Sequence, residues 1–228
     1  MRLDELGELG LLRELEDRGL AHGIEHDAAK VGGLVVTQDA LVEGVHFRFD
    51  LVSWRDLGYR AAAANISDLA ASGAEPLALL VALCLPGETE LDDVLELYAG
   101  FGEAGVPVRG GDTSRARDVV LSVTALGRAE RVPGRAGARS GDVVVVSGPL
   151  GAAGASFREG RLARPPLRVE EGLRLARVAT AMLDVSDGLA VDAGHIARRS
   201  GCRVELELER VPLAPGALVE DVNFGEDY

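Results

Sequence analysis

The order of its segments predicts that this chain is an α/β (α+β) protein of two domains, with a largely antiparallel sheet in the first domain. Apolar residues recur at helical spacing in some segments and form short continuous runs in others, so helices and strands are interspersed. A stretch rich in Arg, Gly and Pro at 130–141 separates two such sets of segments. With 228 residues, the chain is long enough for two small domains. We therefore expect domains at 1–130 and 131–228.

The N-terminal segments predict one helix followed by two strands. Residues 3–18 carry leucine at helical spacing between acidic residues, which is typical of an amphipathic helix. The apolar runs at 34–38 and 41–47 predict two strands on either side of a short bend.

A long helix is expected over 54–73. Ser53 and Asp56 have the spacing of a capping box, which marks its first turn. Its run of alanines would let another backbone pack close, and Gly73 would end it.

The remaining elements follow from the same signals. Pro76 precedes an apolar strand, and Thr89 is expected to cap the next helix. Strands are expected at 77–85, 106–111, 119–129, 142–147, 181–186 and 202–208, and helices at 91–105, 150–160, 168–179 and 188–201.

Composition and charge narrow the class of protein. The net charge of −13 argues against nucleic acid and against an anionic membrane surface as partners, because both attract basic patches. No apolar run is long enough to span a bilayer, and the N-terminus lacks the pattern of a signal peptide. Cys84 and Cys202 lie far apart in apolar contexts, which favours two free thiols in a reducing compartment. A cytoplasmic protein is expected.

Six aspartates lie at the ends of apolar runs, among glycines, serines and small aliphatic residues. Such a carboxylate either caps a turn or belongs to a site. If several converge without cations, each pair at ~4 Å costs about 4 kcal/mol at an effective dielectric constant near 20. Convergence would therefore need metal ions, and Mg²⁺ is a natural partner of carboxylates. The six are Asp27, Asp39, Asp68, Asp112, Asp184 and Asp187.

A P-loop is excluded, because Lys30 is the only lysine and no GxxxxGK[ST] motif is present. Any nucleotide phosphates would have to be neutralised by metal ions and arginines instead.

The segments VVTQDALVEGVHF, AANISDLAASGAEPLALL, VRGGDTS and LDVSDGLAVDAGHIA resemble the thiamine-monophosphate kinase family, from about Ile24 to Tyr228. Singly, GGD and SDG are ordinary turn sequences, but four such segments in the family's order are specific. The resemblance implies a two-domain fold like that of aminoimidazole ribonucleotide synthetase. Its N-terminal domain would pair with a second copy to form a β-barrel, so a homodimer is expected.

The resemblance also implies a reaction, the transfer of the γ-phosphate of ATP to thiamine monophosphate. The attacking oxygen belongs to a phosphate that is already ionised, so no catalytic general base is expected. Charge neutralisation and in-line positioning dominate phosphoryl transfer, and aspartates holding several Mg²⁺ ions would supply both.

The resemblance assigns roles to individual positions. For several of them, a turn, a solvated helix face, a strand or a surface charge is the alternative explanation. Metal ligation is implied for Asp27, Thr37, Gln38, Asp39, Asp68, Asp112, Asp184 and Asp187, ATP contact for Gly111, Asp112, Arg135 and Ser186, and substrate contact for His46 and Glu226.

The chain departs from the family's pattern in three places. Glu25 and His26 replace the first two residues of GDDAA, and Gln38 replaces a hydroxyl residue before Asp39. Relatives continue for several tens of residues past GEDY, which implies an incomplete second domain and a partly open substrate pocket. Two other functions therefore stay open: a degenerate relative that binds nucleotide without turnover, and a related enzyme with another acceptor.

Overall fold

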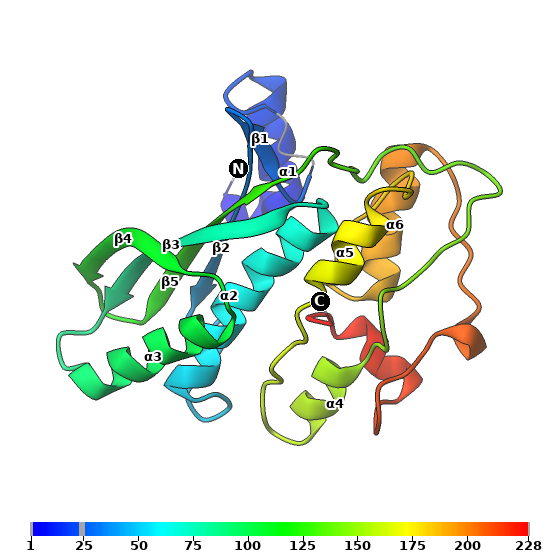
Figure 1. Cartoon of the computed structure of the whole chain (residues 1–228). Helices are drawn as coiled ribbons and strands as arrows, with labels where there is room; N and C mark the ends of the chain where they lie inside the picture. Colours follow the sequence, from blue (N-terminus) through cyan, green and yellow to red (C-terminus); the bar gives the residue numbers. More distant parts are fainter. Residues whose placement is uncertain (1, 23–25, 228) are drawn as a thin grey trace.

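A five-stranded mixed sheet forms the N-terminal half of the molecule (Figure 1). The computed structural model describes residues 2–22 and 26–227, without the side chains of residues 8 and 9. The strand order is β1-β2-β5-β3-β4, and only β3 and β4 run parallel, which confirms the largely antiparallel sheet. The strands are β1 Ala29–Val31, β2 Leu34–Val42, β3 Glu75–Leu85, β4 Val108–Arg115 and β5 Val120–Arg128.

Helices α2 (Trp54–Ala71) and α3 (Leu91–Glu103) lie along one side of this sheet (Figure 1). Alternate residues of the strands, such as Leu79, Val81 and Val123, point to that side and are fully buried in the main core. The opposite face of the sheet carries exposed residues. They are Gln38, Ala40, Leu80 and Ala82.

The expected cap and close packing of α2 are confirmed. The backbone N–H of Asp56 donates to the Ser53 hydroxyl, and Gly73 adopts a positive φ just past the helix. A Cβ at Gly58 would overlap the carbonyl of Leu97 on α3, so glycine is needed for this helix contact.

The C-terminal part packs on another side of α2, where Gly172 lies against the backbone of Ala70 (Figure 1). Its helices were expected near the observed positions. They are α4 Ala152–Arg158, α5 Val169–Leu175 and α6 Leu189–Ser200, followed by the short 3₁₀ turns η1 Leu208–Arg210 and η2 Val219–Asn223.

The strands expected at 142–147, 181–186 and 202–208 are wrong for the described structure, because none of these segments is paired in a sheet. These segments have the apolar residues of a strand, but those residues are not all buried, and Val143 is 84% exposed. A strand exists only when its backbone groups find a partner strand, so the pattern by itself was insufficient.

Three boundaries also differ from expectation. Residues 41–47 do not form a second strand, because β2 runs to Val42 and the chain then turns at Gly44, which has a positive φ. Glu90, not Thr89, is the N-cap of α3. Strand β4 extends past the predicted end to Arg115.

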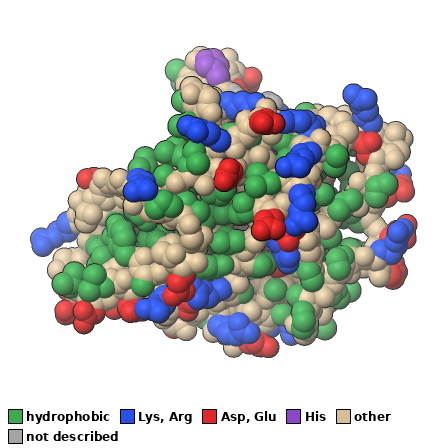
Figure 2. All heavy atoms as spheres, in the orientation of Figure 1, with side chains coloured by type: hydrophobic (Ala, Val, Ile, Leu, Met, Phe, Trp, Pro, Cys, Tyr) green, Lys and Arg blue, Asp and Glu red, His purple; other side chains and the backbone are tan. Residues whose placement is uncertain are grey.

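Helix α1 (Leu3–Asp17) lies near β1 and is interrupted at Gly7, whose φ of 67° is not helical (Figure 1). Among residues 2–22 and 26–227, no helix combines the length and the apolar character needed to cross a membrane. Figure 2 shows acidic and basic side chains interspersed on the side of the molecule in view. The domain boundary near residue 130 stays a prediction, and Ile24, Glu25 and Tyr228 lie outside the described residues.

Candidate active site

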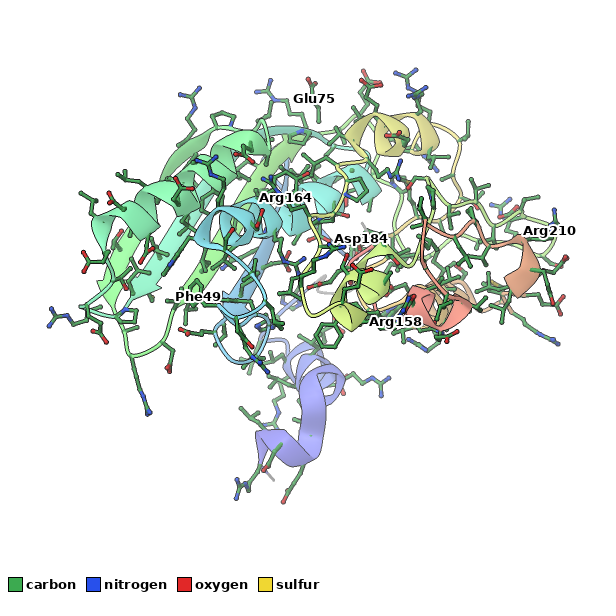
Figure 3. All side chains as sticks on the ribbon, turned by 90° about the horizontal axis from the view of Figure 1, so that it is seen from below. Phe49, Glu75, Arg158, Arg164, Asp184 and Arg210 are labelled. Carbon is green, nitrogen blue, oxygen red and sulfur yellow. The ribbon has the colours of Figure 1, made fainter. Side chains whose placement is uncertain are left out.

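Three carboxylates from distant parts of the chain converge between the two halves of the molecule. Asp27 precedes β1, Asp68 lies in the last turn of α2, and Asp184 precedes α6. One oxygen from each lies within 4.8 Å of the others. In Figure 3, Asp184 lies near the centre of the view, where the ribbons of the two halves meet. The convergence expected of the aspartates therefore exists for these three.

Hydroxyl groups on neighbouring elements orient two of these carboxylates. The Thr37 hydroxyl donates to Asp68 at 2.5 Å, and the Ser67 hydroxyl donates to Asp184 at 2.8 Å. Thr37 and Asp39 alternate along β2, so both side chains point to the face covered by α2. Strand β2 thus brings Asp39 to the edge of the carboxylate group.

The carboxylates raise one another's pKa values. Burial, followed by repulsion from Asp27, raises the pKa of Asp184 to about 7. Burial and then Asp184 raise the pKa of Asp68 well above its ordinary value. The pKa of Asp39 is also raised, by burial and then by Asp27, although His46 partly offsets this. Ionising the whole group therefore requires positive charge from outside it.

Arg135 supplies one positive charge from the segment between the two halves. Its guanidinium holds Asp27 through Nη2 and through Nε at 3.1 Å. Its backbone N–H donates to Nδ1 of His26 at 3.5 Å, and the His26 ring lies against Gly134. His26 thus contacts the segment that carries Arg135.

A second group lies at the start of α6. Ligand atoms of Asp187, Asp192 and His195 lie within 4.8 Å of one another. The buried Asp192 carboxylate accepts backbone N–H groups from Asp187 and Gly188, each at 3.0 Å. Burial raises the pKa of Asp192 to about 6. This carboxylate therefore fixes the loop that carries Asp187.

Sequence reasoning did not assign Asp192 to the site. Its position in the first turn of α6, after Gly188, was the available signal, because an acid there can hold free N–H groups at a helix start.

The C-terminal loop closes over the loop that carries Asp187. The N–H of Glu226 donates to the carbonyl of Ser186 at 3.0 Å, and that of Asp227 donates to Val185 at 3.1 Å. Gly225 allows this approach, because a Cβ there would overlap the Ser186 carbonyl. Ser186 and Glu226, assigned to ATP and substrate contact, are therefore neighbours.

Three other assigned residues lie apart from the carboxylate group. Gln38 points to the opposite face of the sheet, where its amide donates to Ser122 at 3.0 Å. Asp112 is exposed on β4 and in register with Ala82, whose side chain lies on that same open face. Gly111 precedes Asp112, and a Cβ there would overlap Val81 of β3.

His46 lies in the turn after β2 and not in a strand. Its Nδ1 accepts the N–H of Val42 at 3.0 Å, and the side chain is exposed. The Nε2 atom is then the protonated nitrogen of the neutral ring, and it remains available as a donor.

Carboxylates with a threonine hydroxyl form an oxygen-rich donor set of the kind that binds Mg²⁺. Between a nucleotide and a second anion, such a set can position phosphate groups through divalent cations. An apolar cleft or a nucleophile–base pair would indicate other chemistry.

Comparisons with known proteins find relatives that cover most of the chain. The family described as AIR synthase related protein, N-terminal domain, matches residues 25–129. Thiamine-monophosphate kinase of Aquifex aeolicus is 36% identical over 94% of this chain and 78% of that protein. The enzyme of Methanopyrus kandleri is 39% identical over 87% of this chain and 69% of that protein. The match to the solved structure of AaThiL complexed with AMPPCP and TMP covers 100% of this chain and 85% of that chain, with 34% identity and a TM-score of 0.91.

Proposed function

This chain belongs to the thiamine-monophosphate kinase family, and from that premise we propose that it transfers the γ-phosphate of ATP to thiamine monophosphate. The product is thiamine diphosphate. The convergence of Asp27, Asp68 and Asp184 supports the proposal, because clustered carboxylates can hold the cations that two polyanionic substrates need between them.

The residues present fit Mg²⁺. Asp27, Asp39, Asp68 and Asp184 are proposed to hold the ions, with Thr37 orienting Asp68. Bound Mg²⁺ would neutralise phosphate oxygens and align donor with acceptor. The raised pKa values of Asp68 and Asp184 support this fit, because a cation would allow both groups to ionise at neutral pH.

The chain's own side chains then bind and orient the substrates. Arg135 holds Asp27 and is proposed to contact phosphate oxygens as well. Asp192 keeps the Ser186–Asp187 loop in place through its backbone N–H groups. No side chain needs to remove a proton from the acceptor phosphate, so no general base is assigned.

A homodimer is the second part of the proposal. The exposed face of the sheet carries small and apolar residues, including Ala40, Leu80 and Ala82. Asp112 shares that face, apart from the carboxylate group of its own chain. Pairing two copies through this face would place Asp112 at an interface, where it could contribute to ATP binding. The cytoplasmic location also remains a prediction.

Incubation with Mg²⁺, ATP and thiamine monophosphate, followed by chromatographic separation, tests the activity. Formation of thiamine diphosphate is expected, and omission of Mg²⁺ should abolish it. ATP binding without product would favour a degenerate nucleotide-binding protein instead. Turnover only with another phosphorylated acceptor would favour a related enzyme of the same fold.

A further inference from the structure

Arg60 is a buried cation near the middle of α2. Its side chain is only 4% exposed. A buried guanidinium is costly unless its N–H groups are paired, so its partners identify its role. Nη1 donates to the carbonyl of Ala163, and Nη2 donates to Oε2 of Glu226 at 2.6 Å. Within the described part of the chain, its Nε has no hydrogen-bond partner.

These contacts join three segments. One is α2 itself. The second is the segment at 161–165, which is also held by Tyr59 of α2, whose hydroxyl donates to the carbonyl of Pro165 at 2.9 Å. The third is the C-terminal loop that carries Glu226. Arg60 therefore fixes the Glu226 side chain relative to both other segments.

Glu226 occupies a conformation that needs such support. Its φ of 56° makes it the only non-glycine residue with positive φ among those described. That conformation is unfavourable for a residue other than glycine and persists only when surrounding contacts enforce it. The backbone bond to Ser186 holds one side of the residue, and Arg60 holds the carboxylate.

We propose that Arg60 is a positioning residue for the acceptor end of the site, where it sets the Glu226 carboxylate for contact with thiamine monophosphate. This inference rests on the proposed function. The planar guanidinium reaches a carbonyl and a carboxylate at once, whereas the single ammonium of lysine serves such a fork poorly. In this role, Arg60 acts through the Glu226 carboxylate and does not itself contact the substrate.

Steady-state kinetics of Arg60→Met, Arg60→Lys and Glu226→Gln test the inference, with KM measured separately for each substrate. For Arg60→Met we expect KM for thiamine monophosphate to rise about 10-fold or more, because loss of a charged hydrogen bond has that order of effect. KM for ATP should stay within about 2-fold of the wild-type value. Arg60→Lys should give a KM for thiamine monophosphate between that of the wild type and that of Arg60→Met.

A double variant separates positioning from general damage. Because Arg60 and Glu226 act through one contact, Arg60→Met/Glu226→Gln should be no worse than the poorer single variant. It also removes the carboxylate that Arg60→Met leaves unpaired, so it is the variant to use if Arg60→Met does not fold. Arg164→Met is the matched control, because Arg164 belongs to the same segment but pairs with Asp56 and Glu103 and stacks on Tyr59.

Each result has a distinct meaning. Equal rises in both KM values, or a loss in Arg164→Met as large as in Arg60→Met, would show a merely structural role and overturn the inference. An active wild type with an unaffected Arg60→Met variant would overturn it as well. A wild-type chain that forms no thiamine diphosphate would instead refute the proposed function, and this inference with it.

Discussion

At the residue scale, Asp68 shows how one position serves both packing and chemistry. Its neighbours Ser67 and Leu69 are buried, and the last turn of α2 holds the carboxylate next to Asp27 and Asp184. Burial and like charges both oppose ionisation there. Such an arrangement lowers the stability of the fold, so a functional reason for it is expected. These carboxylates are therefore the first residues to mutate.

Asp68→Asn should lower kcat/KM by on the order of 100-fold or more, because it removes a proposed cation ligand while keeping the shape of the side chain. Asp56→Asn is the matched change on the same helix. Asp56 lies in the capping box and pairs with Arg164, so its loss should cost about 1 kcal/mol of stability and little activity. Product formation measured by chromatography decides between them, and equal losses would mean that the site is misplaced.

The raised pKa of Asp184 predicts how the stability of the chain changes with pH. Its pKa in the folded chain, about 7, exceeds its ordinary value of 3.8. The folded state therefore binds more protons than the unfolded state between these values. The contribution of Asp184 to the stability of the fold is therefore complete below pH 3.8, and it disappears as the pH rises through about 7. In EDTA, the melting temperature should fall by several degrees between pH 5.5 and pH 8, since about 1 kcal/mol corresponds to 2–4 °C for a chain of this size.

Mg²⁺ should reverse this trend, because it binds the ionised carboxylates. It should raise the melting temperature more at pH 8 than at pH 5.5. Differential scanning fluorimetry measures both effects, and Asp184→Asn should flatten the pH dependence. A Mg²⁺ effect that is the same at both pH values would contradict the prediction.

The sequence predicted the individual acidic residues better than their partners. Asp27, Asp68 and Asp184 are among six aspartates that were singled out because they lie at the ends of apolar runs, and the family resemblance implied their role. Arg60 and Asp192 were missed, because their roles depend on which loops fold back onto α2 and α6. Gln38 was assigned because it stands at the family's hydroxyl position before Asp39, but alternation along a strand sends neighbouring side chains to opposite faces.

At the scale of elements, α2 and α3 approach closely through glycines. A Cβ at Gly100 would overlap the carbonyl of Arg55, just as one at Gly58 would overlap Leu97. The close packing of α2 and α3 can therefore be tested by adding a single methyl group at one of these glycines.

Gly100→Ala should destabilise the chain by roughly 1–3 kcal/mol, because the added methyl group forces the two helices apart. Gly102→Ala, on the same helix, is the matched control. A Cβ at Gly102 meets nothing within 4 Å, so alanine there should stabilise by about 0.5–1 kcal/mol through its higher helix propensity. Urea unfolding gives both values, and opposite signs are expected.

The helices of the second half were predictable, and its strands were not. Helix α6 begins and ends close to the expected positions, because local spacing and Gly201 define it. The segments at 142–147 and 202–208 have strand patterns but no partner among the described residues. Strand formation depends on distant pairing, which a local pattern does not specify.

At the scale of the whole molecule, helices α2 and α3 cover one face of the sheet (Figure 1). The other face carries the exposed small and apolar residues Ala40, Leu80 and Ala82, beside Gln38 and Asp112. An uncovered sheet face of this kind is a common interaction surface. The strong net charge of −13 would keep single copies apart unless such a face brings them together. The dimer proposal thus concerns a specific surface and can be tested there.

Light scattering at micromolar concentration should give about twice the 23.9 kDa mass of the chain. Ala82→Arg should give a monomer, because a guanidinium in the middle of the open face would be buried without a partner. Leu95→Arg places the same group on α3, where Leu95 is 56% exposed, and should leave the dimer intact. Since Asp112 lies in register with Ala82, the monomeric variant should also bind ATP more weakly. A wild-type monomer would contradict the dimer, and a monomeric Leu95→Arg variant beside a dimeric Ala82→Arg variant would move the interface to α3.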